Sequence, residues 1–515
     1  MEAGRLDGAV VLVGFMGAGK STGARTLAAE LGVEPLDSDH ELERRLGEPI
    51  ESYFDREGEQ AFRAREEELV LELLERRPRT IGRPAVLALG GGAVQSERIR
   101  EALARHTVVH LEVRPEDAWR RASGKGRPLA REPGRFEQLQ RDRAPLYEAV
   151  AHAVVPPGDR DALRRAAPAV LALREAPPGT RLVWASAESG EYPVYLGRGL
   201  IPSGFFYPRE GRRLVVTDSN VARNQPFEGD ERIVVMPGEE RKTIHGAEFV
   251  LRGLAQANAE RGVDLVVAVG GGVVGDVAGF CAAVYQRGMR HVQVPTTLVA
   301  QVDSAYGGKT GVDLPEGKNY VGAYHQPTAV LCDPAALDTL PEEELAAGYA
   351  EVVKTALIAG GQLWARVRQG GEPDSETIMG CIRTKLAVVA ADERDAGRRQ
   401  VLNLGHTVGH ALETATSYSR YRHGEAVAIG LLAALRLSGR DALRAEVAEL
   451  LAARGLPVQL SGASVDDVLA SVERDKKRVG GRVPFVLVEA PGDVTPGHEI
   501  GAGELRAAIE ELHAG

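Results

Sequence analysis

The chain has 515 residues, a formal net charge of −10 and a hydrophobic content of 43%. A domain averages roughly 100–200 residues, so two to four domains are expected. The acidic balance disfavours nucleic acid and anionic membrane partners, and no apolar run reaches the roughly 18 residues of a membrane span. The three cysteines are far apart, which argues against a disulfide framework or a thiolate metal site. We therefore expect a cytoplasmic protein whose basic residues gather locally.

Residues 1–172 alternate short apolar runs with charged helical stretches. Strands are expected at 9–13, 85–89, 108–112 and 151–155, and the longest helix at 57–77. This alternation predicts a parallel sheet with helices on both faces. Residues 173–180 are rich in proline and glycine and are the expected linker to the second domain.

Residues 181–515 begin with a second α/β pattern. Strands are expected at 194–196, 214–217, 233–235, 265–269 and 292–294. From about residue 340 helical periodicity dominates, with helices expected at 348–359, 378–391, 406–414, 425–438 and 442–453. The overall class is α/β, with 181–339 as one part and 340–515 as a separate, mostly helical part.

The sequence GFMGAGKST at residues 14–22 fits the pattern G-x-x-x-x-G-K-[ST] between an apolar run and a helical segment. Glycines in this position allow backbone N–H groups to surround phosphate oxygens. Lys20 would reach the outer phosphates, and Ser21 would hold Mg²⁺. The first domain is therefore predicted to bind a nucleoside triphosphate.

Further residues of the first domain favour a small-molecule kinase. Asp37 and Asp39 follow the phosphate-loop helix, where one carboxylate can orient Mg²⁺ through water and the other can accept a proton from a hydroxyl group. A triple glycine at residues 90–92 allows close approach of a ligand. A basic stretch at 120–131, interrupted by glycine and proline, is typical of a lid that closes over phosphates, although a solvated loop is the alternative.

The second domain carries GGGVVG at residues 270–275, which fits G-x-G-x-x-G after a strand. The acidic residue expected about 20 residues later is missing, but Asp218 follows a different strand. We interpret this as a Rossmann-like nucleotide site of non-standard arrangement. Asp303, Lys309, Lys318 and Asn319 follow in a polar stretch whose lysines suit an anionic substrate.

His406 and His410 are four residues apart on an expected helix and share a face, and His423 follows. Two histidines on one face with a third nearby favour a metal site. A metalloprotease is disfavoured because H-E-x-x-H is absent. A carboxylate such as Glu351 could complete the ligand set, but spacing alone does not select it.

The order of the first-domain motifs (GFMGAGKST, DSD, GEQAFRARE, ALGGGAV, GKGRPLA, DRAPLYEAV) resembles the shikimate kinase family over residues 5–170. The resemblance implies that Asp39 orients the attacking hydroxyl of shikimate and that Arg127 is the lid arginine; both would be catalytic. The residues implied for ATP·Mg²⁺ are Gly14, Gly17, Gly19, Lys20, Ser21, Thr22, Asp37 and Arg127, and those implied for shikimate are Asp39, Arg63, Gly91, Gly92 and Arg143.

The second domain resembles the 3-dehydroquinate synthase family in PGEERKT, GGGVVGDVAGF, VPTTLVAQVDSAYGGKTGVD, GKNYVGAYHQP, YAEVVK, NLGHTVGHALE and HGEAVAIG. The resemblance implies Zn²⁺ (or Co²⁺) held by Glu351, His406 and His423, and catalytic roles for His410, Lys309, Lys354 and Arg399. It implies NAD contacts at Asp218, Asn220, Glu239, Lys242, Gly271, Gly272, Asp276, Thr296, Thr297, Asp303, Lys309 and Lys318. It implies contacts to the heptulosonate phosphate at Arg287, Lys309, Asn319, Lys354, Lys385, Arg399, Asn403, His410 and Lys476.

Together the resemblances imply a bifunctional shikimate-pathway enzyme with small-molecule substrates and a homodimer formed through the second domain. Three alternatives stay open. A related sugar-phosphate cyclase would keep the metal and NAD residues but alter Asn319, Lys385 or Arg399. A polyol dehydrogenase would not need phosphate-binding lysines and would accumulate NADH. A nucleotide-gated binding protein would have lost Lys20, Ser21 or the two aspartates.

Overall fold

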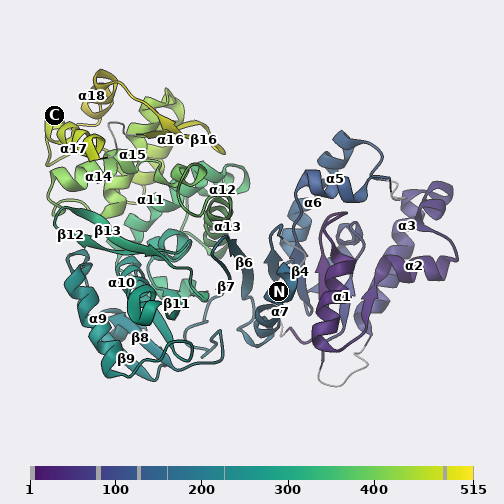
Figure 1. Cartoon of the computed structure of the whole chain (residues 1–515). Coiled ribbons are helices and arrows are strands. Elements are labelled where there is room, and N and C mark those ends of the chain that lie inside the picture. Colours follow the sequence, from purple (N-terminus) through teal and green to yellow (C-terminus); the bar gives the residue numbers. More distant parts are fainter. Residues whose placement is uncertain are drawn as a thin grey trace. The chain divides into compact units, whose positions relative to one another are not determined.

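The computed structural model describes residues 6–76, 83–124, 129–158, 161–225, 227–478 and 484–513, with side chains at 475–478 not described. The chain forms two compact units. The first comprises residues 1–186 and 191–209, and the second comprises residues 187–190 and 210–515. Both are built as α/β layers (Figure 1).

The sheet of the first unit has the strand order β2 (Pro35–Asp37), β3 (Val86–Ala88), β1 (Val10–Val13), β4 (Thr107–Leu111), β5 (Ala153–Val155), β6 (Arg181–Ala187), β7 (Gly190–Leu196). The pairs from β2 to β6 are parallel. All four residues of β1, VVLV, are buried, as expected of a central parallel strand rich in β-branched residues.

The α-helices among the described residues of this unit are α1 (Lys20–Leu31), α2 (Ser38–Leu46), α3 (Ile50–Glu75), α4 (Glu97–Leu103), α5 (Pro115–Ala122), α6 (Pro133–Val150) and α7 (Ala162–Ala172). α1 follows the left-handed Gly19 and ends at the left-handed Gly32, a common helix stop. The core on one side of the sheet joins Val11, Val13 and Leu87 to the apolar faces of α3, α4 and α6. The predicted strands at 9–13, 85–89, 108–112 and 151–155 are all present, each within a residue or two of its expected bounds.

The boundary between the units differs from the sequence prediction. The expected linker 173–180 contains a short 3-10 helix (Leu173–Glu175) with Leu173 buried, and Thr180 is buried as well. β6 then extends the first sheet, with Leu182 in register with Ala153. Residues 181–186 and 191–209 therefore lie in the first unit. A pattern of proline and glycine indicates a turn, but it cannot show which sheet the next strand joins.

The sheet of the second unit is parallel, in the order β14 (Ala329–Cys332), β11 (Arg290–Pro295), β10 (Leu265–Gly270), β8 (Arg213–Asp218), β9 (Glu231–Val235). α9 (Ile244–Gln256) and α10 (Gly272–Val284) pack on it and share a core with Leu214, Val216 and Val266. Because the strands are parallel, residues 218, 270–272 and 295–297 meet at one edge of the sheet.

The rest of the second unit is mainly helical, as predicted. Its helices are α8 (Val221–Asn224), α11 (Glu342–Ala359), α12 (Gly361–Val367), α13 (Ser375–Ala391), α14 (His406–Ala415), α15 (His423–Leu437), α16 (Asp441–Ala452), α17 (Val465–Arg478) and α18 (Ala502–Glu510). Two antiparallel hairpins, β12 (Lys309–Leu314) with β13 (Gly317–Tyr324) and β15 (Phe485–Ala490) with β16 (Asp493–His498), were not predicted. Within this unit the β12–β13 hairpin lies between strand β8 and helices α11, α14 and α15 (Figure 1).

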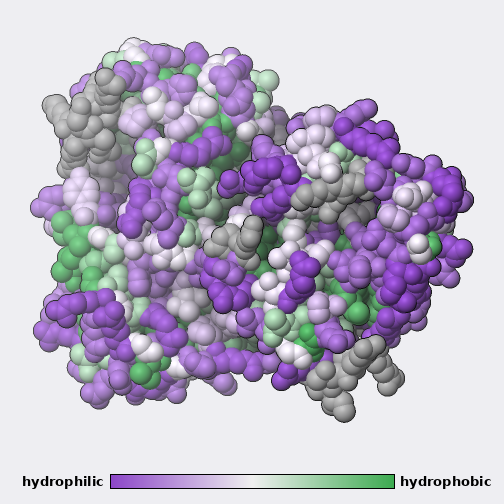
Figure 2. Space-filling view, turned by 45° about the vertical axis from the view of Figure 1, so that its right-hand side comes forward, coloured by the Kyte–Doolittle hydropathy of each residue, from purple (hydrophilic) through white to green (hydrophobic). Residues whose placement is uncertain are grey.

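Hydrophilic residues dominate the face of the molecule in Figure 2, with apolar residues in smaller groups among them. Among the described helices, none combines the length and the apolar character that crossing a bilayer requires.

Two histidines tie central strands of the first unit to their surroundings. The amide of Ala9 donates to Nδ1 of His106 at 2.9 Å, and the amide of Val108 donates to Nδ1 of His152 at 3.3 Å. Burial, reinforced by the charge of Arg105, lowers the pKa of His106 to about 4, and burial also lowers the pKa of His152 to about 4. Both rings are therefore neutral acceptors in the folded protein at neutral pH.

We predict that the first unit loses stability as the pH falls from about 6.5 to about 4. An unfolded histidine binds its proton near pH 6.5 but folded His106 only near pH 4, so protons favour the unfolded state by up to about 3 kcal/mol. Hydrogen exchange of peptides covering β1 and β4, corrected for intrinsic exchange rates, measures the loss. His106→Gln should weaken the pH dependence, and His40→Gln, an exposed control, should not. Protection that stays constant across this interval would contradict the prediction.

Candidate active sites

The phosphate loop of the first unit wraps around the head of α1. Gly14, Gly17 and Gly19 have positive φ angles of 146°, 80° and 92°. A Cβ atom on Gly17 would lie 2.7 Å from the carbonyl oxygen of Ala118, so no side chain fits there. Nζ of Lys20 donates to the carbonyl oxygens of Gly14 (2.8 Å) and Phe15 (3.1 Å), which holds the ammonium group over the loop. This cradle of backbone N–H groups at a helix N-terminus fits a phosphate.

The two aspartates stand where β2 meets α2. Asp37 caps α2, because its Oδ1 accepts from the amides of Asp39 (3.1 Å) and His40 (3.4 Å). The buried Oγ of Ser38 accepts from the amide of Gly90 at 2.9 Å and so joins this turn to the triple glycine. Asp37 and Asp39 both line the same cavity as Lys20 and Ser21.

Arginines surround the triple glycine. Arg143 is buried and donates to the carbonyl oxygen of Gly91 at 3.2 Å, while Arg63 pairs with Glu66 at 2.5 Å and sits against Gly92. Within the described part of the chain, Nε of Arg63 and Nε of Arg143 are buried without a hydrogen-bond partner. The buried Arg143 and the partly exposed Arg63, each with a buried Nε donor that has no partner among the described residues, fit a carboxylate ligand at this wall.

These groups line one cavity of about 1120 Å³ in the first unit. Its lining includes the phosphate-loop residues Gly17 and Gly19 to Thr22 but not Gly14, together with both aspartates, Arg63, Gly91, Gly92 and Arg143. Arg127 and Lys125 lie outside the described residues, so the lid prediction stays a prediction. Arg121, which precedes them, donates to the carbonyl oxygen of Gly17 at 3.2 Å. The sequence missed Glu66, which is buried and pairs with Arg63.

In the second unit, several of the predicted dinucleotide residues lie at the carboxyl edge of the parallel sheet, whereas Lys309 and Lys318 lie on the β12–β13 hairpin. Asp218 ends β8 and caps α8 through the amides of Asn220 (2.8 Å) and Val221 (3.0 Å). α10 begins directly after Gly271, where a Cβ atom would lie 2.8 Å from Cγ2 of Thr297. Oγ1 of Thr296 is buried without a partner among the described residues. A glycine-lined helix N-terminus beside unused donors fits a dinucleotide phosphate.

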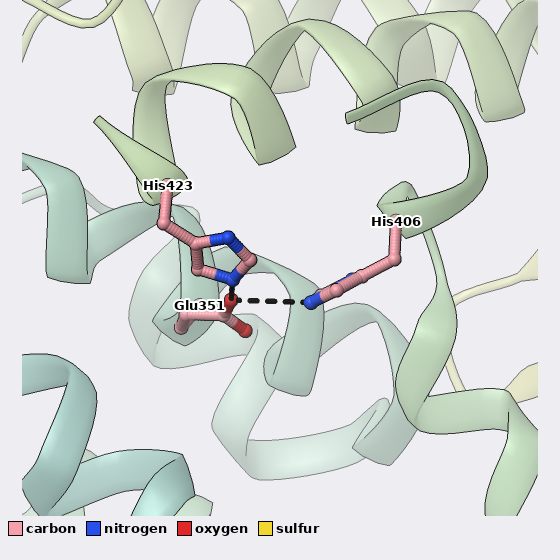
Figure 3. Close-up of side chains that lie close together, drawn as sticks. All are labelled: Glu351, His406 and His423. Atoms are coloured by element: carbon pink, nitrogen blue, oxygen red, sulfur yellow. Dashed lines mark ion pairs between the residues drawn. The ribbon is translucent and has the colours of Figure 1, made fainter. Parts of the chain in front are cut away.

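Glu351, His406 and His423 come together from three helices (Figure 3). Oε1 of Glu351 lies 3.3 Å from Nε2 of His423 and 3.6 Å from Nε2 of His406. Glu351 belongs to α11 and is almost completely buried, and the histidines are the first residues of α15 and α14. One carboxylate and two imidazoles are a common ligand set of catalytic zinc, which leaves positions open for water or substrate.

The Nδ1 atoms of both imidazoles, which lie opposite Nε2, also have oxygen partners. Nδ1 of His406 lies 3.2 Å from the carbonyl oxygen of Leu404, and Nδ1 of His423 lies 3.5 Å from Oε1 of Glu413. Acceptors at Nδ1 favour the tautomer whose Nε2 is free to bind a metal. Burial lowers the pKa of His406 to about 3. Burial also acts to lower the pKa of His423, but Glu351 and Glu413 raise it to about 9, so proton and metal compete for this ring.

A chain of alternating charges leads from the metal ligands to the sheet edge. Nζ of the buried Lys354 lies 2.5 Å from Oε2 of Glu351 and 2.6 Å from Oδ2 of Asp303, and Lys385 pairs with the other oxygen of Asp303. Burial lowers the pKa of Lys385, and Asp303 opposes this effect. Two buried ammonium groups beside a metal ligand set provide the positive charge that an anionic substrate needs.

Arg399 lies in the loop that follows α13. It is 2% exposed and donates to the carbonyl oxygens of Glu393 (2.5 Å) and Gly307 (3.0 Å). Its Nε is buried without a partner in the described residues. Lys309, two residues after Gly307, pairs with Asp395 of the same loop. Gly307 and Lys309 thus connect the start of β12 to the segment between α13 and α14 that carries Asp395 and Arg399.

Two further ion pairs join residues predicted to contact NAD. Nζ of Lys242 lies 2.6 Å from Oδ2 of Asp276, and Nζ of Lys318 lies 3.3 Å from Oε1 of Glu239. Lys318 also contacts Oε1 of Glu413 at 3.0 Å. These pairs connect residues 239–242, which precede α9, with α10 and β13.

Some predicted residues are not placed in these clusters. Arg287 is exposed after α10, with a φ of 65°, and in the described structure no hydrogen bond or ion pair joins it to the other site residues. Asn403 and His410 are exposed, although the His410 ring lies 5.2 Å from that of His406 and 5.9 Å from that of His423. Asn319 has a φ of 57°, and its backbone N–H donates to Oδ1 of Asp313 at 2.7 Å. The side chain of Lys476 lies outside the described residues.

Family models match three consecutive parts of the chain: shikimate kinase at residues 16–172, 3-dehydroquinate synthase N-terminal at 232–347, and 3-dehydroquinate synthase C-terminal at 348–478. The two synthase models meet at residue 347/348, within α11.

Among curated proteins, the 3-dehydroquinate synthase of Nitrobacter hamburgensis is 42% identical over 351 residues, which cover 61% of this chain and 91% of that protein. Among solved structures, 2-epi-5-epi-valiolone synthase of Streptomyces hygroscopicus with bound NAD⁺ and Zn²⁺ is 25% identical, with a TM-score of 0.56 and coverage of 64% of this chain and 98% of that chain. A 2-deoxy-scyllo-inosose synthase with carbaglucose-6-phosphate, NAD⁺ and Co²⁺ is also 25% identical, with a TM-score of 0.57 and coverage of 64% and 100%.

The metal ligand set, the glycine-lined sheet edge and the buried lysines agree with these matches. The chain belongs to the 3-dehydroquinate synthase family and carries a shikimate kinase domain in its first part.

Proposed function

We propose that the chain carries two activities of the shikimate pathway. The first unit transfers the γ-phosphate of ATP to the 3-hydroxyl group of shikimate. The second unit converts 3-deoxy-D-arabino-heptulosonate 7-phosphate into 3-dehydroquinate and phosphate. The observation that carries the second assignment is the joining of Glu351, His406 and His423 to the buried Lys354–Asp303–Lys385 chain.

In the kinase site, the loop around Gly14–Gly19 would hold the ATP phosphates, and Ser21 would hold Mg²⁺ with support from Asp37. Arg63 and Arg143 present guanidinium donors at Gly91 and Gly92, where they would grip the shikimate carboxylate. Asp39 lines the same cavity and would orient the hydroxyl group and take its proton. Catalysis here is positioning and charge neutralisation.

In the synthase site, Glu351, His406 and His423 would hold the metal, and the edge formed by Asp218, Gly271 and Thr297 would hold NAD. When bound, NAD supplies a hydride acceptor that is restored in each cycle, and the metal supplies a Lewis acid for the substrate hydroxyl groups. Lys354, Lys385 and Arg399 would bind substrate carboxylate and phosphate. His410, near the metal ligands but exposed, would relay protons with solvent.

Related cyclases share this fold, so the choice of substrate needs its own support. The two cyclases of known structure share this fold but are only 25% identical in sequence to this chain. The 3-dehydroquinate synthase relative is 42% identical to it over 91% of its own length. Asn319, Lys385 and Arg399, the positions at which another cyclase would differ, keep the shikimate-type residues. A homodimer formed through the second unit and a cytoplasmic location complete the proposal.

The deciding experiment is phosphate release from 3-deoxy-D-arabino-heptulosonate 7-phosphate by the full chain, with catalytic NAD⁺ and no ATP. We expect release without accumulation of NADH, because the hydride returns to the substrate. Stoichiometric NADH would identify a polyol dehydrogenase. Absence of release, from protein that still binds NAD⁺, would point to another cyclase substrate.

Removal of the metal should separate the two activities. After chelation and gel filtration, we expect phosphate release to fall at least about 100-fold and to return on addition of Zn²⁺ or Co²⁺. Shikimate phosphorylation with fresh Mg²⁺ should be unchanged. His406→Ala should lose release without rescue, whereas His245→Ala, a substitution at an exposed histidine of the same unit, should keep it. Full release by metal-free protein would refute the ligand assignment.

Substitution in the phosphate loop should have the opposite selectivity. Lys20→Ala removes the ammonium group that lies over the loop, and Asp39→Asn removes the proton acceptor, so each should lower kcat for shikimate phosphorylation by about 100-fold or more. Phosphate release by the second unit serves as the internal control for folding and should match that of the unsubstituted chain. Wild-type phosphorylation by Asp39→Asn would remove Asp39 from the mechanism.

A further inference from the structure

Glu413 is a buried carboxylate that belongs to neither the predicted metal ligands nor the predicted NAD contacts. It is 2% exposed and lies on α14, seven residues after His406. Seven residues are about two helical turns, so Glu413 lies on the same face of α14 as His406 and His410. A buried carboxylate must be compensated by hydrogen bonds or opposite charge, which makes its partners informative.

Its Oε1 has two cationic partners from different parts of the second unit. Nδ1 of His423 lies at 3.5 Å, and Nζ of Lys318 lies at 3.0 Å. His423 is the first residue of α15 and a predicted metal ligand. Lys318 is on β13 and a predicted NAD contact. One oxygen of Glu413 therefore contacts both a predicted metal ligand and a predicted NAD contact.

The contact with His423 decides which ring nitrogen faces the metal position. With Nδ1 directed to Glu413, Nε2 lies 3.3 Å from Oε1 of Glu351. A carboxylate behind a histidine ligand fixes its tautomer and orientation and raises its basicity. Without Glu413, rotation of the His423 ring would have no barrier from this side.

The contact with Lys318 fixes the β12–β13 hairpin relative to α14. The ammonium group also lies 4.9 Å from the ring centroid of Tyr418, which follows the same helix, and 3.3 Å from Oε1 of Glu239. Glu239 and Lys318 are both predicted to meet NAD. A ligand that reorganises Lys318 therefore changes the surroundings of the carboxylate that holds His423.

We propose that Glu413 is a positioning residue that orients His423 for the metal and, through Lys318, couples metal binding to NAD binding. This inference rests on the proposed function only in placing a metal at Glu351, His406 and His423 and NAD near Lys318. His410, Glu413 and His423 also have the spacing of a second cation site. The ammonium group at 3.0 Å from Glu413 disfavours that alternative, which the metal count tests.

The test compares three variants of the full chain. Glu413→Leu removes both contacts. Glu413→Gln keeps an oxygen that can accept from Nδ1 of His423 but removes the charge that holds Lys318. Asp264→Asn is the matched control, because it changes another buried carboxylate of the second unit. Asp264 pairs with Arg212 at 2.8 Å and contacts neither His423 nor Lys318.

Zinc affinity of the metal-free chains is measured by competition with a chromophoric chelator, with and without saturating NAD⁺. The visible spectrum of the Co²⁺-loaded chain reports the ligand geometry independently of activity. We expect Glu413→Leu to bind zinc 10- to 100-fold more weakly with a changed Co²⁺ spectrum. In the unsubstituted chain NAD⁺ should tighten zinc binding at least about fivefold, and zinc should tighten NAD⁺ binding by the same factor.

Glu413→Gln should keep most of the zinc affinity but lose the effect of NAD⁺, and Asp264→Asn should change neither quantity. Unchanged zinc affinity in folded Glu413→Leu, or unchanged coupling in Glu413→Gln, would overturn the proposal. Two zinc ions per unsubstituted chain, falling to one in either Glu413 variant, would overturn it in favour of a second cation site. If Glu413→Leu does not fold, coupling in the isosteric Glu413→Gln decides. An unsubstituted chain that binds no zinc would instead refute the ligand set of the proposed function.

Discussion

The almost completely buried carboxylate of Glu351 is the constraint on which the second unit depends. A carboxylate removed from water costs several kcal/mol unless opposite charge and hydrogen-bond donors replace the solvent. Here His406, His423 and Lys354 replace it, and each comes from a helix terminus or a neighbouring turn. Opposing effects determine the charge state: burial raises the pKa of Glu351, but Lys354 and the two histidines hold it well below its usual range. The helices α11, α14 and α15 must converge for this to happen, and their convergence brings together the proposed metal ligands.

The first unit binds anions by a different physical route. Its phosphate loop relies on backbone N–H groups and on glycines with positive φ angles, so affinity comes from the chain path itself. The proposed carboxylate-binding wall consists of Arg63 and Arg143, whose guanidinium groups are held against the triple glycine. Burial lowers the pKa of Arg143, and the adjacent Tyr147, whose pKa is raised to about 12 by burial, stays a neutral donor to Gly91. Both units are thus expected to bind anionic ligands, but through different structural features.

The sequence predicted the parts of this structure that local pattern controls. The phosphate loop, the central strands and the long helices follow from glycine spacing and hydrophobic periodicity, although α3 begins seven residues and α11 six residues before the predicted start. The hairpins β12–β13 and β15–β16 were missed because their burial patterns do not alternate cleanly. The two compact units do not divide at the expected linker, because β6 pairs in parallel with β5 after α7 and the segment that looks like a linker. Glu351 could be chosen only by family resemblance, since nothing in its spacing distinguishes it from the other acidic residues. Glu413 had a local signal: His406, His410 and Glu413 follow the i, i+4, i+7 spacing of one helix face.

A common feature connects the cations of both sites: apart from the exposed Arg287, the described cations that the ligands are predicted to meet are already paired with a carboxylate or a carbonyl oxygen of their own unit. Lys354 and Lys385 share Asp303, Lys318 shares Glu413 and Glu239, Lys309 pairs with Asp395, and Arg63 pairs with Glu66. Such pairing orders long side chains before the substrate arrives, so less conformational entropy is lost on binding. It also reconciles cationic sites with a net charge of −10, because the local positive potential is small until a polyanionic ligand displaces or adds to these contacts. Selectivity then follows, since a weak or singly charged anion cannot compensate for the carboxylates, whereas a ligand with both a phosphate and a carboxylate group can.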